Sequence, residues 1–407
     1  MTGGALQKKL LPHTMRSEVR ILLVFGTRPE AIKMAPLVLE LQKSENITTR
    51  VCVTAQHRKM LDQVLSVFDI QPDWDLNLMR PGQGLFEITA GVLSGMKRVL
   101  EEEKPDIVLV QGDTTTAFSA SLAAFYMQIP VGHVEAGLRT YNIRSPYPEE
   151  LNRQMVSRIA DWHFAPTDAN RAALVSEGVL ADQIVVTGNT VVDALLWMKN
   201  RLISDSFVRE MAEREIETAG WKKRGKKHPF ILITGHRRES FGQGFSDICK
   251  AIRNIAQAHP YMDLVYPVHL NPRVQGPVRE ALAGLGNVHC IRPLGYPAFV
   301  LLMIESDLIL TDSGGIQEEA PSLERPCIVM RETTERTEAL EAGTVLLAGT
   351  NPDRIFEAVD CLLTNKDFYR SMARKPNPYG DGMASLRIAD FLLKRMATSE
   401  IQRKSTN

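Results

Sequence analysis

Acidic side chains follow two separate apolar runs of this 407-residue chain. Asp113 comes just after Ile107–Val110, Glu135 directly follows Val131–Val134, and a third acid, Glu149, lies a little further on. Parallel strands end at one edge of a sheet, so we expect these carboxylates to converge there. Clustered carboxylates are typical of proton transfer. For Asp113, which precedes three threonines, a plain helix cap is the alternative.

Basic residues follow the first apolar run. The sequence Gly-Thr-Arg-Pro-Glu begins at Gly26, and it places Arg28 and Lys33 near the start of an expected helix. The helix N-terminal amides and these two cations could hold an anion; the alternative is an ordinary strand-to-helix turn with surface charges. No GxGxxG follows this run, and GxxxxGK[ST] is absent from the chain. Nicotinamide and P-loop nucleotide chemistry are therefore disfavoured.

A Ser-Gly-Gly turn follows a later apolar run that ends at Thr311. Ser313, Gly314 and Gly315 offer consecutive unhindered amides, which suit a diphosphate. Glu319 comes one helical turn later, where it could accept hydrogen bonds from ribose hydroxyls. A tight turn is the alternative, but the paired glycines and the acid favour an anion site.

One histidine stands at the end of an apolar run with two arginines after it. His236 follows Phe230–Thr234 and Gly235, so it would face a ligand at the carboxyl end of that strand. It could donate to a phosphate oxygen as charge builds on a leaving group. A purely structural histidine is the alternative.

The elements that must position these residues alternate along the whole chain. The expected strands are Arg20–Phe25, Arg50–Thr54, Ile107–Val110, Val131–Val134 and Ile184–Thr187, then Phe230–Thr234, Leu264–Pro267, Val288–Ile291, Leu308–Thr311 and Cys327–Met330. Between the first of them lie the amphipathic stretches Glu30–Lys43, Arg58–Phe68 and Thr115–Gln128. This rhythm predicts parallel sheets covered by helices on both faces.

The repeated rhythm predicts the α/β fold class, with two doubly wound, Rossmann-like domains facing each other across a cleft. We expect a disordered N-terminal tail at 1–18, an N-terminal domain at 19–187 and a C-terminal domain at 188–384. A C-terminal helix that packs back on the N-terminal domain, and then a tail, would occupy 385–407. The stretch Gly188–Arg201 is the expected hinge.

Composition narrows the function further. Hydrophobic residues make up 44% and charged residues 24%, as in a soluble globular protein. Lys+Arg and Asp+Glu both number 48, so nothing draws the whole molecule to nucleic acid or to a membrane. No apolar run suits a signal peptide or a membrane span. The five scattered cysteines, without CxxC or HExxH spacing, predict no metal site and fit a reducing cytoplasm.

Together these segments resemble the non-hydrolysing UDP-N-acetylglucosamine 2-epimerases of bacteria. The similarity covers about residues 19–395 and runs in order through FGTRPEAIKMAPL, VTAQHRKMLDQVL, QGDTTT, IPVGHVEAGLRT, SPYPEELNRQ, TGNTVVDALL, TGHRRESFG, YPVHLNP, LTDSGGIQEEAPSL and NPYGDG. So many ordered motifs make chance similarity implausible.

The resemblance implies a glycosyltransferase-B type fold, UDP held between the domains by the C-terminal one, and a homodimer. It implies conversion of UDP-N-acetylglucosamine to UDP-N-acetylmannosamine for surface polysaccharide, with no cofactor and no metal. UDP would leave C1 as the C2 proton is lost, giving a glycal, and both would return with C2 inverted.

The resemblance also implies roles for single residues. The catalytic positions match Asp113, Glu135, Glu149 and His236. The substrate positions match Arg28 and Lys33, Phe299 near uracil, Ser313, Gly314 and Gly315 at the diphosphate, and Glu319 at the ribose. Some members bind a second substrate molecule as an activator beside positions matching Gln56, His57 and Glu149. An arginine of that activator site corresponds to Gly82 here, which argues against activation.

Three other functions fit parts of this pattern. A hydrolysing 2-epimerase would release free N-acetylmannosamine and UDP from the same fold. A glycosyltransferase of this architecture would need an acceptor, and the three clustered acids disfavour it. A non-catalytic sensor of UDP-sugars would not need every one of these acids.

Overall fold

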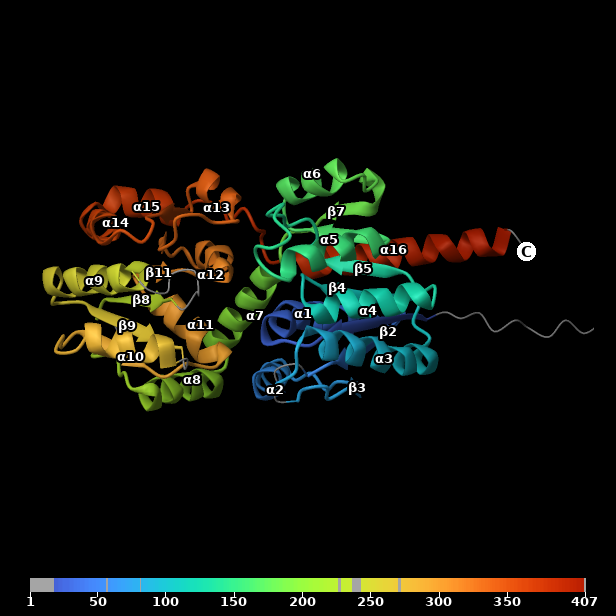
Figure 1. Cartoon of the computed structure of the whole chain (residues 1–407), viewed down its shortest axis with the longest axis horizontal. Helices are drawn as coiled ribbons and strands as arrows, with labels where there is room; N and C mark the ends of the chain where they lie inside the picture. Colours follow the sequence, from blue (N-terminus) through green and yellow to red (C-terminus); the bar gives the residue numbers. More distant parts are fainter. Residues whose placement is uncertain are drawn as a thin grey trace, which may run out of the picture.

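The structure is a computed structural model of the chain, and it describes residues 18–55, 58–80, 82–225, 228–235, 243–269 and 272–405. Within these ranges the strands form two parallel sheets, in two lobes that lie side by side (Figure 1). The predicted α/β class with two doubly wound domains is therefore confirmed.

The N-terminal sheet has the strand order β3-β2-β1-β4-β5-β6-β7. Its strands are β1 (Val19–Phe25), β2 (Ile47–Val53), β3 (Trp74–Asp75), β4 (Ile107–Gln111), β5 (Val131–Val134), β6 (Trp162–Ala165) and β7 (Ile184–Val186). The C-terminal sheet has the order β10-β9-β8-β11-β12-β13. Its strands are β8 (Phe230–Thr234), β9 (Asp263–Pro267), β10 (Val288–Ile291), β11 (Leu308–Thr311), β12 (Cys327–Val329) and β13 (Val345–Leu347).

Helices connect these strands. In the first half they are α1 (Arg28–Leu41), α2 (Arg58–Val67), α3 (Leu85–Glu103), α4 (Thr115–Tyr126), α5 (Glu149–Ile159), α6 (Asp168–Ser176), α7 (Thr190–Ser204) and α8 (Ser206–Ala219). In the second half they are α9 (Gln243–Ala258), α10 (Pro272–Ala281), α11 (Tyr296–Glu305), α12 (Gly314–Glu319), α13 (Thr337–Ala342), α14 (Pro352–Thr364), α15 (Lys366–Ala373) and α16 (Ala384–Ser405). None of the helices in the described part of the chain has the length and apolar character needed to cross a membrane.

Both faces of each sheet are buried. In β1, Leu23 belongs to one hydrophobic cluster, whereas its neighbour Leu22 belongs to another on the opposite face. In β8, Leu232 and Ile233 divide between two clusters in the same way. Because both faces are covered, these strands are continuous apolar runs rather than alternating ones. This is why the sequence predicted them.

Three strands were missed. β3 has only two residues, and β13 is a short strand at the edge of its sheet. β6 contains His163, which is 1% exposed. Burial lowers the pKa of His163 to about 4, so the ring is neutral in the fold. A neutral imidazole can occupy a buried strand position, as His133 also does in β5.

The chain passes between the lobes twice, and the two passages touch. Gly188 lies before α7 with φ of +86°, and Gly380 lies before α16 with φ of +127°. The Asn189 amide donates to the Tyr379 carbonyl oxygen at 2.7 Å. The Asp193 carboxylate accepts the Ser385 amide at 2.7 Å, which anchors the start of α16. From there α16 runs along the N-terminal lobe and packs against α1 (Figure 1).

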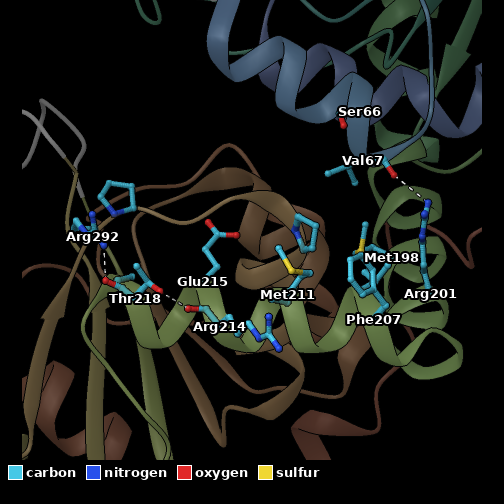
Figure 2. A pocket seen from close by; sticks show the side chains of 15 residues that line it. Ser66, Val67, Met198, Arg201, Phe207, Met211, Arg214, Glu215, Thr218 and Arg292 are labelled. Carbon is cyan, nitrogen blue, oxygen red and sulfur yellow. Dashed lines mark hydrogen bonds between the residues drawn. The ribbon is translucent and has the colours of Figure 1, made fainter.

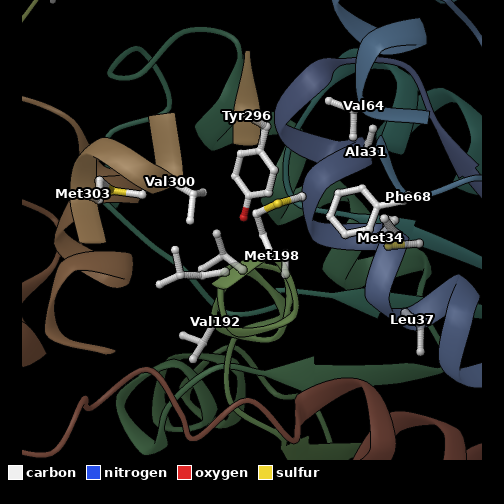
Figure 3. Close-up of a cluster of buried hydrophobic side chains, with 14 of the residues drawn as sticks. Ala31, Met34, Leu37, Val64, Phe68, Val192, Met198, Tyr296, Val300 and Met303 are labelled. Carbon is white, nitrogen blue, oxygen red and sulfur yellow. The ribbon is translucent and has the colours of Figure 1, made fainter. Parts of the chain in front are cut away.

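Apolar side chains from both lobes meet around α7. Met198 on α7 lies between Tyr296 of α11 and Phe68 just after α2 (Figure 3). The ring centroids of Phe68 and Tyr296 are 6.1 Å apart, and Phe68 also stacks on Trp197 at 4.5 Å. α7 therefore carries a hydrophobic core that is shared by both domains.

We expect Gly188→Ala to lower the free energy of unfolding by about 2–3 kcal/mol, because it adds both strain and a clash. A Cβ at Gly188 would lie 3.3 Å from both the Gly380 Cα and the Tyr379 carbonyl oxygen. Urea denaturation measures the change. Gly178→Ala is the matched control: φ there is +88°, with nothing within 4 Å of the new Cβ, so it should cost only about 1 kcal/mol. Equal losses would show that the contact between the two passages does not constrain Gly188.

Candidate active site

The predicted site residues lie where the order of each sheet reverses. β1 pairs with β2 on one side and β4 on the other, and β8 likewise separates β9 from β11. Ligands of open α/β sheets bind beyond the carboxyl ends of strands at such reversals. Arg28 follows β1, Asp113 follows β4, and Ser313 follows β11. Both halves of the expected site thus occupy the preferred place in their sheets.

Buried Glu30 fixes the turn that carries Arg28. Its carboxylate accepts the backbone amides of Gly26 at 3.1 Å and Thr27 at 2.7 Å. It also accepts the Thr114 hydroxyl at 2.5 Å, which joins this turn to the one after β4. Gly26 is required by packing, because a Cβ there would lie 2.0 Å from the Thr54 hydroxyl oxygen. The two turns of the N-terminal domain are therefore held as one unit.

A buried ion pair lies at the centre of the site. Lys33 Nζ contacts the Glu135 carboxylate, and Gln111 Nε2 donates to the same oxygen at 3.0 Å. Lys33 Nζ is also 3.8 Å from Glu318 Oε2, on α12 of the other domain. The Glu318 carboxylate accepts from Arg336 Nε at 2.9 Å. A chain of alternating charges thus crosses from one domain to the other.

This pairing outweighs burial in setting the charge states. Burial alone would raise the pKa of Glu135 and lower that of Lys33. The attraction between them is stronger, so the pKa of Glu135 is lowered and that of Lys33 is raised. Both groups are ionised, and an ionised Glu135 is able to accept a proton.

The Ser-Gly-Gly turn lies against a cation that the sequence did not predict. A Cβ at Gly314 would be 3.0 Å from the Arg336 guanidinium carbon, so a larger residue there would have to displace this arginine slightly. The Ser313 amide donates to the Thr311 hydroxyl at 2.9 Å, and the Ser313 carbonyl accepts Gln317 Nε2 at 3.1 Å. The positive charge of Arg336 therefore stands beside the proposed diphosphate turn.

Glu319 and Arg28 face each other from opposite domains. Burial, and then the neighbouring Glu318 carboxylate, raise the pKa of Glu319 to about 8. Arg28 and Lys33 oppose that rise. Arg28 Nη2 donates to the Leu294 carbonyl at 3.4 Å, so it reaches the loop before α11. These contacts bring the expected ribose acid close to a cation of the N-terminal domain.

The other two acids lie at neighbouring points of the same edge. Asp113 follows Gly112, which has φ of +69°, and its carboxylate pairs with Arg153 of α5. Glu149 is the first residue of α5 and is half-buried. Its neighbour Glu150 is fully buried and lies 3.3 Å from Arg153 Nη1. α5 therefore connects the Asp113 and Glu149 positions.

The remaining predicted positions are either not described by the structure or lie away from the charged residues. His236, Gln56 and His57 lie outside the described residues. Gly82, which corresponds to an arginine of the expected activator site, is exposed, with nothing within 4 Å of its Cβ position. Phe299 lies on α11 and packs partly buried against the core.

A cavity of about 860 Å³ lies beside the site, between α2, α7, α8 and the loop before α11 (Figure 2). Val67 and Pro297 line it from the two domains. Glu215 on α8 points into it and accepts the Gly295 amide at 2.6 Å. Neither Lys33 nor the predicted acids line this space. The cavity therefore adjoins the Phe299 end of the site rather than the carboxylates.

Sequence reasoning missed four residues that organise the site: Gln111, Arg153, Glu318 and Arg336. Glu318 is adjacent to Glu319, and a helical projection of that segment could have drawn attention to it. Arg336 lies 18 residues beyond Glu318, and only the tertiary fold brings the two together.

The fold and the site define an α/β enzyme of two parallel-sheet domains, with carboxylates and cations gathered where the domains meet. The chain belongs to the UDP-N-acetylglucosamine 2-epimerase family, whose model matches residues 39–393. The UDP-N-acetylglucosamine 2-epimerase of Yersinia pestis is 56% identical over 93% of this chain and 100% of its own. That of Escherichia coli K12 is 55% identical over 92% and 98%. The crystal structure of the Neisseria meningitidis enzyme bound to UDP-GlcNAc is similar with a TM-score of 0.86 and 51% identity, over 92% of this chain and 100% of its own.

The raised pKa of Glu319 predicts a pH-dependent stability. An exposed glutamate titrates near 4.5, so the folded protein holds an extra proton between about pH 4.5 and about 8. Its stability therefore falls as the pH rises through that range. Glu319→Gln removes the ionisation, so this variant should gain stability relative to the wild type between pH 5 and pH 8, as measured by urea unfolding. Glu357→Gln, at an exposed position, should show no such gain. If the difference in the free energy of unfolding between Glu319→Gln and wild type were the same at pH 5 and pH 8, the raised pKa of Glu319 would be contradicted.

Proposed function

We propose that this protein inverts C2 of UDP-N-acetylglucosamine to give UDP-N-acetylmannosamine, without hydrolysis. The observation that carries the proposal is the charge chain between the domains, in which Lys33 joins Glu135 to Glu318. It places a proton acceptor beside cations that suit a diphosphate. Family membership supplies the substrate class, because relatives that match nearly their whole length carry this enzyme name.

In this proposal the nucleotide lies between the two domains. Ser313, Gly314 and Gly315 hold the diphosphate with Arg336 beside them, and Glu319 accepts the ribose hydroxyls. Arg28 and Lys33 approach from the N-terminal domain. Phe299 packs near uracil, next to the loop that Arg28 contacts. The presence of cations on both sides supports diphosphate binding at this place.

The chemistry must avoid direct removal of the C2 proton, which has no neighbouring carbonyl to make it acidic. The C1–O bond breaks and its electron pair leaves with UDP, while a carboxylate takes the C2 proton to give the glycal. A proton then returns to the opposite face of C2 as UDP adds back to C1. Asp113, Glu135 and Glu149 are the acids we assign to these transfers. His236 is assigned as a donor to the departing diphosphate.

Proton NMR of the purified protein with UDP-N-acetylglucosamine in D2O tests the function. We expect UDP-N-acetylmannosamine to form and to carry deuterium at C2, because the proton returned comes from solvent-exchanged carboxyl groups. Free N-acetylmannosamine and UDP as the main products would show a hydrolysing enzyme instead. Epimerisation without any deuterium at C2 would contradict the elimination path.

The acids are tested one at a time. Asp113→Asn and Glu135→Gln should each lower turnover on the order of 100-fold or more, because each removes a proton-transfer group. Isothermal titration should show that UDP still binds. Glu101→Gln, at an exposed position of α3, is the control and should keep wild-type turnover. Wild-type turnover in either test variant would remove that residue from the mechanism.

We propose that the protein is a homodimer that associates through α4 and α5. These helices pack against each other. On their outer side α4 presents Leu122 and Phe125, and α5 presents Leu151 and Met155, at helical spacings of three and four. An apolar face of this kind on a soluble protein commonly marks an association surface.

We also propose a cytoplasmic location for the protein. The five free cysteines support it.

Analytical ultracentrifugation tests the dimer. The wild type should sediment as a dimer, and the double variant Leu122→Glu, Met155→Glu as a monomer, since two charges would enter the interface. Ile203→Glu is the control, because Ile203 is an exposed apolar residue on α7, away from this surface. A monomeric wild type, or a double variant that remains dimeric, would refute this surface.

A further inference from the structure

The turn that carries Asp113 is held by hydrogen bonds from side chains as well as from the backbone. The Gly112 amide donates to the Val134 carbonyl at 2.9 Å, which continues the pairing of β4 with β5. His133 Nε2 is 2.7 Å from the Gly112 carbonyl oxygen. Burial lowers the pKa of His133 to about 3, so the ring is neutral and donates this hydrogen bond from Nε2. Asn152 Nδ2 donates to the Asp113 carbonyl at 2.9 Å. The backbone on both sides of Asp113 is therefore fixed by side chains from β5 and α5.

The side chain of Asp113 is held separately, by Arg153. Arg153 Nη2 donates to Asp113 Oδ2. The Arg153 side chain is 6% exposed, and that of Asp113 is 27% exposed. A buried arginine is costly unless it is paired. The open side of the pair is Asp113, so the ion pair presents a carboxylate, and not the arginine, to the site.

The other side of Arg153 faces a carboxylate that already has a structural task. Glu150 accepts the backbone amides of Thr140 and Tyr141, both at 3.0 Å, and Gln154 Nε2 at 2.8 Å. Glu150 therefore anchors the loop before α5 and also anchors Arg153, at 3.3 Å. The order of contacts is loop, Glu150, Arg153 and then Asp113.

We propose that Arg153 is a positioning residue for the epimerisation: it orients the Asp113 carboxylate toward the C2 proton and does not itself touch the sugar. This inference rests on the proposed function. It assigns to Arg153 a part in turnover, beyond the stabilisation of α5. A carboxylate with two freely rotating torsions would otherwise sample many orientations, and only a few of these point at C2.

A double-mutant cycle in the full-length protein tests the inference, with turnover followed by NMR of UDP-N-acetylglucosamine. Arg153→Ala should lower kcat on the order of 10- to 100-fold, with KM and UDP affinity within about twofold of wild type. In the Asp113→Asn background the same change should cost less than about threefold, because the group it orients is already lost. Added methylguanidinium should restore part of the activity of Arg153→Ala and none of that of Asp113→Asn. Arg171→Ala, at an exposed position of α6 away from the site and from the proposed dimer surface, should behave as wild type.

The outcomes separate this inference from the function beneath it. If wild type does not epimerise, the proposed function fails. If wild type epimerises but Asp113→Asn turns over at the wild-type rate, Asp113 has no part in the mechanism and the positioning role of Arg153 fails with it. If wild type epimerises and Asp113→Asn is impaired, but Arg153→Ala loses equally in the two backgrounds or keeps full kcat, only the positioning role fails. Should Arg153→Ala not fold, Arg153→Lys keeps the charge but not the forked geometry. It should fold and lose kcat at unchanged KM, and full kcat in that variant would overturn the inference.

Discussion

The structure depends on charges that are buried where the two domains meet. Lys33 lies between Glu135 of its own domain and Glu318 of the other, and Arg336 completes the pairing of Glu318. Charges removed from water cost several kcal/mol each unless they are paired, so each member of this chain constrains its neighbours. The pairing keeps Glu135 ionised and gathers cations at one point. In the proposed complex, a diphosphate that entered here would meet Lys33 and Arg336. Its oxygens would then take the place of the protein carboxylates as partners of these two cations.

The scaffold places these charges with little freedom. Both sheets reverse their strand order at the strand before a site turn, so the carboxyl ends of β1, β4 and β11 lie where the domains face each other. Around α7 the domains share an apolar core, and the crossing at Gly188 and Gly380 joins the second passage to the first. The charged side chains on either side of this joint are therefore held by a shared core and by the contact between the two passages.

The strands and the acid positions could be predicted from the sequence, for one physical reason. A strand buried on both faces is a nearly continuous apolar run, so β8 and β11 were predicted with the bounds that the structure has; the bounds of β5 and β10 were also predicted. The polar residues that end such runs were therefore placed at the correct edge. β6 was missed, although β5, which also contains a buried histidine, was predicted. The partners of the acids could not be predicted either. Arg153 and Arg336 acquire their roles by pairing with Asp113 and Glu318, which only the tertiary fold brings to them and no local pattern encodes. The position of His236 lies outside the described residues.

The most direct test of the account is a crystal structure of the protein with UDP bound. The account predicts the diphosphate between the turn at 313–315 and Lys33, with Arg336 in contact. The Asp113 and Glu135 carboxylates should face the space beyond the β-phosphate, where the sugar would be attached. Nucleotide bound away from this charge chain, or carboxylates turned to the far side of their sheet, would contradict it.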